Sequence, residues 1–120
     1  MKAEIPLAFG SASLRAMTTV VAATKPQVWT GEGTLVGIQV CNNQAAVVFI
    51  QLFDALAANV TLATTNPDWE FSVPASTSTS FNPLPACGLK LRIGLVAAST
   101  TTEKGLTGSA AGVQVFYAIQ

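Results

Sequence analysis

The sequence contains no histidine, and only 10% of its 120 residues are charged. Histidine is the general base in the usual Ser–His and Cys–His pairs, so its absence excludes nucleophilic catalysis of that form. A zinc site would need two ligands besides Cys41 and Cys87, and no histidine can supply them. The chain therefore has little of the chemistry on which most enzymes depend.

Charge of one sign is also missing, because six basic residues balance six acidic ones. A nucleic-acid surface needs a dense cationic stripe, since neutralising several phosphates supplies the affinity. The basic residues are scattered, and the closest pair, Lys90 and Arg92, fits one solvated face of a strand. We therefore expect no nucleic-acid partner.

The sequence has no stretch suited to a membrane or to export. The longest apolar stretch, 45–60, contains Gln51 and Asp54 and is shorter than the ~20 residues that span a bilayer. The N-terminus lacks the apolar core of a secretory signal. We expect synthesis in the cytosol, which favours buried thiols at Cys41 and Cys87 over a disulfide, although a bridge stays the alternative.

Half of the residues are hydrophobic, an unusual share for so few charges. Runs of Ser and Thr at 76–80 and 99–102 supply part of the solubility. Large exposed apolar patches usually mark interfaces, so this composition predicts an obligate oligomer or an assembly subunit.

The apolar residues follow the pattern of short β-strands separated by Gly, Pro and Asn turns. Residues 69–73 (WEFSV) and 89–93 (LKLRI) alternate apolar and polar side chains, as half-buried strands do. The second of these runs belongs to a predicted strand over 87–98, and further strands are predicted at 14–23, 27–29, 76–81 and 113–119. Roughly seven or eight strands of this kind predict a single-domain, all-β antiparallel β-sandwich, jelly-roll-like, over residues 13–120, with an extended N-terminal arm over residues 1–12.

The segment 34–53 is the centre of the predicted fold. Its two apolar runs flank the polar turn Asn42-Asn43-Gln44 and predict a β-hairpin. Gly37 in the first run predicts a β-bulge or a close backbone approach, and Gly94 predicts a second bulge. The second run, 46–53, is apolar on both faces except for Gln51, so we expect it to be covered on two sides. A helix over 45–59 is the rival interpretation, and we expect a single helical turn after the strand.

Two carboxylates are the best candidates for chemistry. Asp68 and Glu70 lie on one face of the strand at 69–73 or at its entry, as a paired-carboxylate hydrolase would require. Carboxylates that alternate on a half-exposed strand are also its ordinary polar face, which is the interpretation that we favour. With Asp54 they could hold calcium, but the dense Asp/Asn/Gly spacing of a calcium loop is missing. We predict that the protein is not an enzyme and has no cofactor or metal.

Residues 35–119 contain, in order, LVGIQVCNNQAAVVFIQLFDA, a Pro-containing loop, WEFSVPASTSTSFNP, GLKLRIGLVAAS, a Thr/Gly/Ala loop and VQVFYAI. This order resembles that of small virion structural proteins of tailed bacteriophages. The likeness is one of pattern over residues 34–120. Pro74-Ala75-Ser76 replaces the glycine often found in the family's turn, and the N-terminal part has no counterpart.

The resemblance implies a structural module that binds and stabilises a phage capsid as a decoration or cement protein, usually as a homotrimer. Its partners would be the major capsid protein and sister chains, and its location the virion, assembled in the host cytoplasm. The interface residues that we predict are Ile5, Leu7, Phe9, Trp29 and Trp69. The alternative is a receptor- or carbohydrate-binding module of a fibre or tail, with Trp29, Trp69 and the loop 99–112 as its contact surface; aromatics on strand faces are more often core or interface residues.

Overall fold

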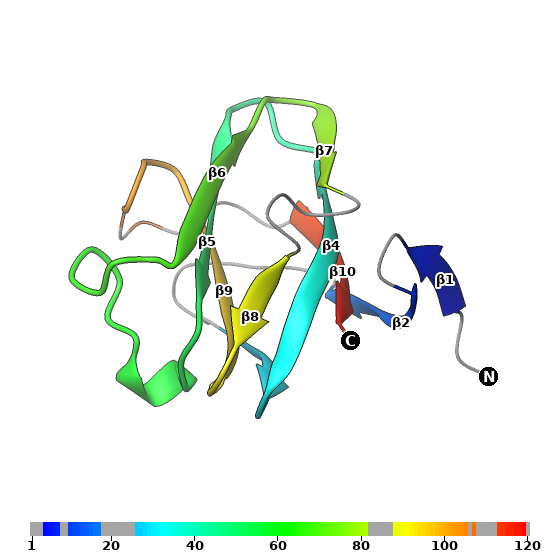
Figure 1. The fold of residues 1–120 in the computed structure, drawn as a ribbon. Helices are drawn as coiled ribbons and strands as arrows, with labels where there is room; N and C mark the ends of the chain where they lie inside the picture. The colour runs from blue at the N-terminus through cyan, green and yellow to red at the C-terminus, as the bar shows by residue number, and fades with distance from the viewer. Residues whose placement is uncertain are drawn as a thin grey trace.

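The computed structural model describes residues 4–7, 10–17, 26–81, 88–105, 107 and 113–119. For residues 4–17, and for residues 114 and 118, the description is of the backbone. These parts of the chain form ten strands and one short 3-10 helix (Figure 1).

The strands form two antiparallel sheets. Sheet A runs in the order β1 (Glu4–Leu7), β2 (Gly10–Met17), β10 (Val113–Ile119), β4 (Gly33–Asn42) and β7 (Thr77–Phe81), and β8 (Leu89–Leu91) pairs with another part of β4. Sheet B runs in the order β3 (Gln27–Thr30), β9 (Gly94–Thr100), β5 (Val48–Phe53) and β6 (Trp69–Val73).

The pairings show a jelly roll. β2 pairs with β10, β3 with β9, β4 with β7, and β5 with β6, so each pair encloses the next along the chain as in one long hairpin. The hairpin is rolled up, because β10 also pairs with β4 in sheet A and β9 with β5 in sheet B. Two sheets built in this way are the jelly-roll architecture. The predicted all-β sandwich is therefore confirmed.

The main core lies between the two sheets. It contains alternate residues of facing strands, such as Ile38 and Val40 from β4 and Ile50 and Leu52 from β5, all at most 3% exposed. The predicted alternation of 69–73 is confirmed, since Val73 is buried in this core. Period-two patterning thus gives each strand one face for the core.

A second, smaller core covers the outer face of sheet B. Phe53, Val96 and Ala98 of the sheet pack with Val60 and Leu62 of the β5–β6 connection. This connection contains the 3-10 helix η1 (Ala57–Asn59), which is the helical turn expected after β5. β5 is therefore covered on both faces, as predicted. The residues that cover it, in the part of the chain that the structure describes, belong to the same chain.

The predicted hairpin of 34–53 is wrong in its pairing. β4 belongs to sheet A and β5 to sheet B, so the turn between them carries the chain from one sheet to the other. The buried Asn42 side chain donates from Nδ2 to the backbone oxygens of Ala46, Val73 and Pro74, at 3.0, 3.2 and 3.1 Å. These bonds join the β4–β5 turn to the β6–β7 turn, which favours the crossing between sheets.

The predicted strand over 87–98 is interrupted at Arg92 and Ile93, which lie between β8 and β9. The Asp54 carboxylate accepts hydrogen bonds from the backbone N–H groups of Arg92, Ile93 and Gly94, so the chain turns there from sheet A to sheet B. Ile93 is consequently 49% exposed, and the expectation that it shares the face of the buried Leu91 is wrong.

The predicted bulges are partly confirmed. The register of β4 against β10 shifts next to Gly37, as expected. At Gly94 the irregularity lies instead on the partner strand β3, between Gln27 and Trp29. A Cβ at Gly94 would lie 2.5 Å from the Trp29 backbone oxygen, so this glycine marks a close approach.

The N-terminal residues form the outer part of sheet A. β1 pairs with β2, which pairs with β10. The division into an arm over 1–12 and a domain over 13–120 stays a prediction.

Candidate interaction surface

The charged side chains lie away from the centre of sheet A. Those described are Glu32, Asp54, Asp68, Glu70, Lys90, Arg92, Glu103 and Lys104. They occupy β6, β8, and the connections that begin at the ends of β3, β5, β8 and β9. None of the charged side chains described lies on β4, β7 or β10.

The candidate carboxylates hold backbone segments in place. Asp68 accepts a hydrogen bond on Oδ2 from the Asp54 N–H at 2.6 Å, and Glu70 accepts one on Oε2 from the Lys104 N–H at 2.8 Å. The two carboxylates thus bind different segments. Within the described residues, no group of three or more Asp, Glu, His and Cys side chains is placed to hold a metal ion.

Gln51 fixes the start of the β9–β10 connection. Its side chain is fully buried and donates from Nε2 to Thr100 Oγ1 at 2.9 Å and to the Gly105 backbone oxygen at 3.3 Å. Among the residues that the structure describes, none donates a hydrogen bond to its Oε1. With the bond between Glu70 and Lys104, this attaches residues 101–105 to sheet B. The loop 99–112 was predicted to be an exposed tip, and residues 101–104 are exposed. The one sequence feature that could have indicated this attachment is Gln51, the single polar residue in the apolar run 46–53.

The two tryptophans lie on separate strands and do not form one surface. Trp29 is on β3 and Trp69 on β6, which are the two outer strands of sheet B. Both are half-buried and pack against the main core. The Trp69 ring lies 4.8 Å from Phe71 and 5.0 Å from Phe81 between ring centroids, so it closes the sandwich between β6 and β7. This arrangement agrees with aromatics that belong mainly to the core.

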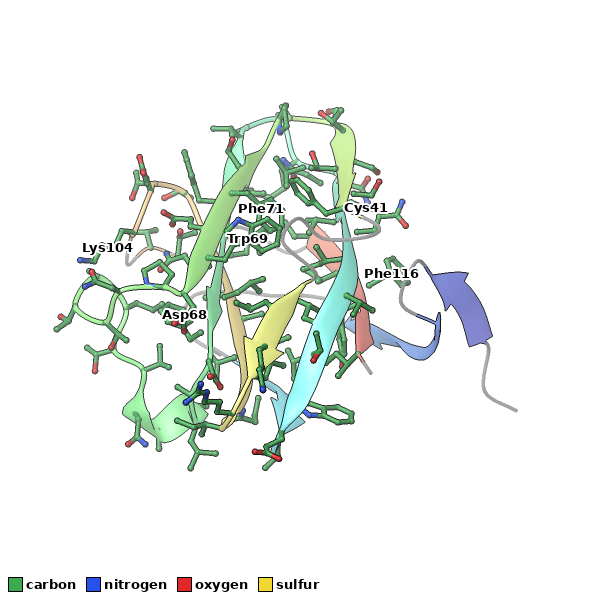
Figure 2. All side chains as sticks on the ribbon, in the orientation of Figure 1. Cys41, Asp68, Trp69, Phe71, Lys104 and Phe116 are labelled. Carbon is green, nitrogen blue, oxygen red and sulfur yellow. The ribbon has the colours of Figure 1, made fainter. Side chains whose placement is uncertain are left out.

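The outer face of sheet A carries an uncharged surface. We call it the charge-free face and define it by Gln39, Cys41, Ser78, Ser80 and Phe116. Gln39 lies opposite both Ser80 and Phe116 in the register, and Cys41 lies opposite Ser78. Gln39 and the two serines are exposed, while Phe116 and the free thiol Cys41 are half-buried. Figure 2 shows Cys41 and Phe116 on the side of β4 and β10 away from Trp69 and Phe71.

The register extends this face into the N-terminal strands. Ala16 of β2 lies opposite Phe116, and Ile5 of β1 lies opposite Ala12 of β2. Because alternate residues of a strand share a face, the residues that share the face of Phe116 in these strands are Ile5, Leu7, Gly10, Ala12, Leu14 and Ala16. Two of the predicted interface residues, Ile5 and Leu7, therefore belong to this face, and Phe9 lies outside the described residues, as does Cys87.

The other alternate series of the N-terminal strands is more polar and contains Glu4, Pro6, Ser11, Ser13, Arg15 and Met17. Glu4 lies opposite Ser13, and Arg15 lies opposite Tyr117, a residue of the main core. Lys90 marks the end of the charge-free face, since it is exposed on β8 opposite Thr34. The sequence did not predict this face, because its residues come from five strands and only the pairing of those strands brings them together.

Among the described residues, none of the helices is long and apolar enough to cross a membrane. Comparison of the chain with protein-family models, with characterised proteins and with solved structures finds no match.

Proposed function

We propose that this chain is a non-enzymatic structural subunit of a bacteriophage virion, which binds the capsid as a decoration or cement protein. The observation that carries the proposal is the charge-free face. It covers three adjacent strands with described side chains and continues by register through two more. Large exposed apolar patches usually mark interfaces. Phe116 and the apolar residues that share its face by register make part of this face apolar, so we take it to be covered on assembly.

The fold agrees with this proposal without deciding it. Jelly rolls occur in viral capsid proteins and in lectins, and a fold shared by both does not choose between them. The surface favours the capsid, because Trp29 and Trp69 lie on opposite edges of sheet B and do not make one stacking platform for a sugar. The order of segments over residues 34–120 resembles that of phage virion proteins, which adds support.

The carboxylates support a structural role. Asp54, Asp68 and Glu70 each accept hydrogen bonds from backbone N–H groups of other segments, which is how a carboxylate holds loops in place. The chain has no histidine to act as a general base beside them. The function proposed is therefore mechanical: the subunit binds the assembled capsid and not its dissociated parts, and so stabilises it by mass action.

Capsid binding tests the proposal. Capsids of the phage that encodes the chain, prepared without it, are mixed with the purified protein and sedimented. We expect saturable co-sedimentation and a higher temperature of capsid disruption. The proposal is overturned if the folded protein stays in the supernatant at a concentration of about 100 µM. This concentration is far above the dissociation constant expected for a specific assembly contact.

A glycan-binding assay separates the alternative function. A carbohydrate-binding module would bind glycans, and Trp69→Ala would abolish that binding while Ser72→Ala on the same strand would not. Capsid binding in the absence of glycan binding is the result that we expect. Glycan binding without capsid binding would replace our proposal by the alternative.

A further inference from the structure

We infer that the charge-free face is the surface through which copies of this chain contact one another. The inference deepens the proposed function and rests on it in one respect, since it assigns one surface of the assembly subunit to sister chains. The occupant is thus a second copy of this chain, and the capsid contacts other parts of the surface.

The first argument is the pattern of the N-terminal strands. In β1 and β2, the residues that share the face of Phe116 are apolar or glycine, such as Ile5, Leu7 and Leu14. The residues that share the face of the main core include Glu4 and Arg15. A strand normally gives its apolar series to its own core. Here the series is reversed, which indicates that the apolar side of β1 and β2 is covered by another molecule.

The second argument is charge. In a contact between two copies of one patch, a charge beside the symmetry axis meets its own copy, and a charge elsewhere meets only what the same patch offers. Like charges across strands or interfaces are unfavourable. The charge-free face avoids this cost, because its described side chains carry no charge and Lys90 lies at its end. A foreign partner would instead allow charges on this face, matched by opposite charges on its own.

The third argument is size. Five strands spaced about 4.8 Å apart are roughly 20 Å wide, and the eight residues of β2 at about 3.3 Å each extend over roughly 26 Å. The face therefore measures on the order of 400–500 Å² in projection, and its accessible area is larger because side chains roughen it. A specific interface buries about 800 Å² on each partner, so the face would supply a large part of an interface of standard size. Phe116 supplies an aromatic near its centre, as interface anchors often do.

Charge substitution at one serine tests the inference. Ser80→Lys and Ser80→Glu each place a charge on the charge-free face, beside Gln39. The controls are Ser72→Lys and Ser72→Glu, because Ser72 is also an exposed serine on an outer strand but lies on β6 of sheet B. Self-association of the isolated protein is measured by sedimentation velocity from about 1 to 100 µM, the range of a moderate affinity.

We expect the unmodified protein to associate, and both Ser80 variants to weaken association at least about tenfold, because a charge of either sign would be buried in a contact that offers it no opposite charge. The Ser72 variants should associate like the unmodified protein. Gln39→Lys provides a second variant at an exposed position of the same face, and circular dichroism shows that each variant is folded.

Three results would overturn the inference: a monomer over the whole range, equal effects at Ser72 and Ser80, or opposite effects of Lys and Glu at Ser80. Opposite effects would place a charged residue of the sister chain across from Ser80, which a contact between two charge-free faces does not provide. The assay contains no capsid, so the two proposals fail separately. A monomer that still binds capsids overturns the inference alone, whereas an oligomer that does not bind capsids overturns the proposed function alone.

Discussion

Asp54 follows β5 of sheet B, and its side chain binds the turn at which the chain passes from β8 of sheet A to β9 of sheet B. Its carboxylate accepts three backbone N–H groups at the turn between β8 and β9, at 2.9 to 3.2 Å. Partial burial raises the pKa of Asp54, but the hydrogen bonds from Ile93, Arg92 and Gly94 and the positive charge of Arg92 outweigh it, so the pKa is lowered from its ordinary value. The ionised form therefore stabilises the folded chain.

A pH-dependent loss of stability follows for Asp54→Asn. A carboxyl group whose pKa is lower in the folded state contributes stability above its unfolded pKa of about 3.9, and that stability is lost as the pH falls through the folded pKa. We expect Asp54→Asn to lower the free energy of unfolding by about 1–2 kcal/mol at pH 7, because hydrogen bonds to a charged acceptor are replaced by weaker ones. Urea unfolding at a series of pH values should show this difference shrinking below about pH 4. A difference that is constant from neutral to acidic pH would contradict the assigned role.

The partners of such residues could not be predicted from the sequence. Asp54, Asp68 and Glu70 were visible as carboxylates, but the N–H groups that they bind lie 14 to 40 residues away along the chain. Backbone donors have no residue signature, so a pattern of side chains cannot indicate them. Asn42 is a similar case, since its type predicted a turn while its buried amide joins two turns.

At the scale of elements, Gly94 controls how closely β3 approaches β9. A Cβ at Gly94 would lie 2.5 Å from the Trp29 backbone oxygen and 2.7 Å from Gln27 Nε2. Gln27 cannot easily move, because Nε2 donates to the backbone oxygens of Trp29 and Ala55, and Oε1 accepts from the Ala57 N–H. The pairing of β3 with β9 therefore depends on the absence of a side chain at Gly94.

Gly94→Ala should destabilise the protein by about 2–3 kcal/mol, because backbone atoms must shift to admit the methyl group. Gly31→Ala is the comparison, since Gly31 has a φ of +97° but nothing within 4 Å of an added Cβ. That change should cost about 1–2 kcal/mol of backbone strain. Hydrogen exchange should distinguish the two: Gly94→Ala exposes the β3 amides, and Gly31→Ala leaves them protected. Equal exchange in both variants would show that space at Gly94 is not what limits the pairing.

The elements themselves were more predictable than their pairing. The strands Trp69–Val73 and Val113–Ile119 were expected at these bounds, because alternation is a local signal. The pairing of β4 with β5 was wrong, because strand neighbours in a jelly roll are set by pairs far apart in the sequence, such as β2 with β10. A local pattern of two apolar runs and a polar turn is the same for a hairpin and for a crossing between sheets.

At the scale of the whole molecule, the structure changes the reason for expecting assembly. The composition indicated an excess of apolar residues, and the strand 46–53 was expected to be covered on two sides. Val60 and Leu62 cover that face from within the chain. The remaining argument comes from β1, β2 and the charge-free face, which only the strand register brings together.

Cys41 reports directly on whether this face is covered. Its thiol is free and half-buried, and it lies on β4 opposite Ser78. In a Cys87→Ser background, which leaves one thiol in the chain, the rate of labelling by a maleimide should follow the fraction of unassociated chains. By mass action the rate should fall about tenfold where nine-tenths of the chains are associated. In Ser80→Lys the same fall should need at least about tenfold more protein, and in Ser72→Lys it should occur as in the parent. A rate that does not change while sedimentation shows association would place the contact between copies on a different surface.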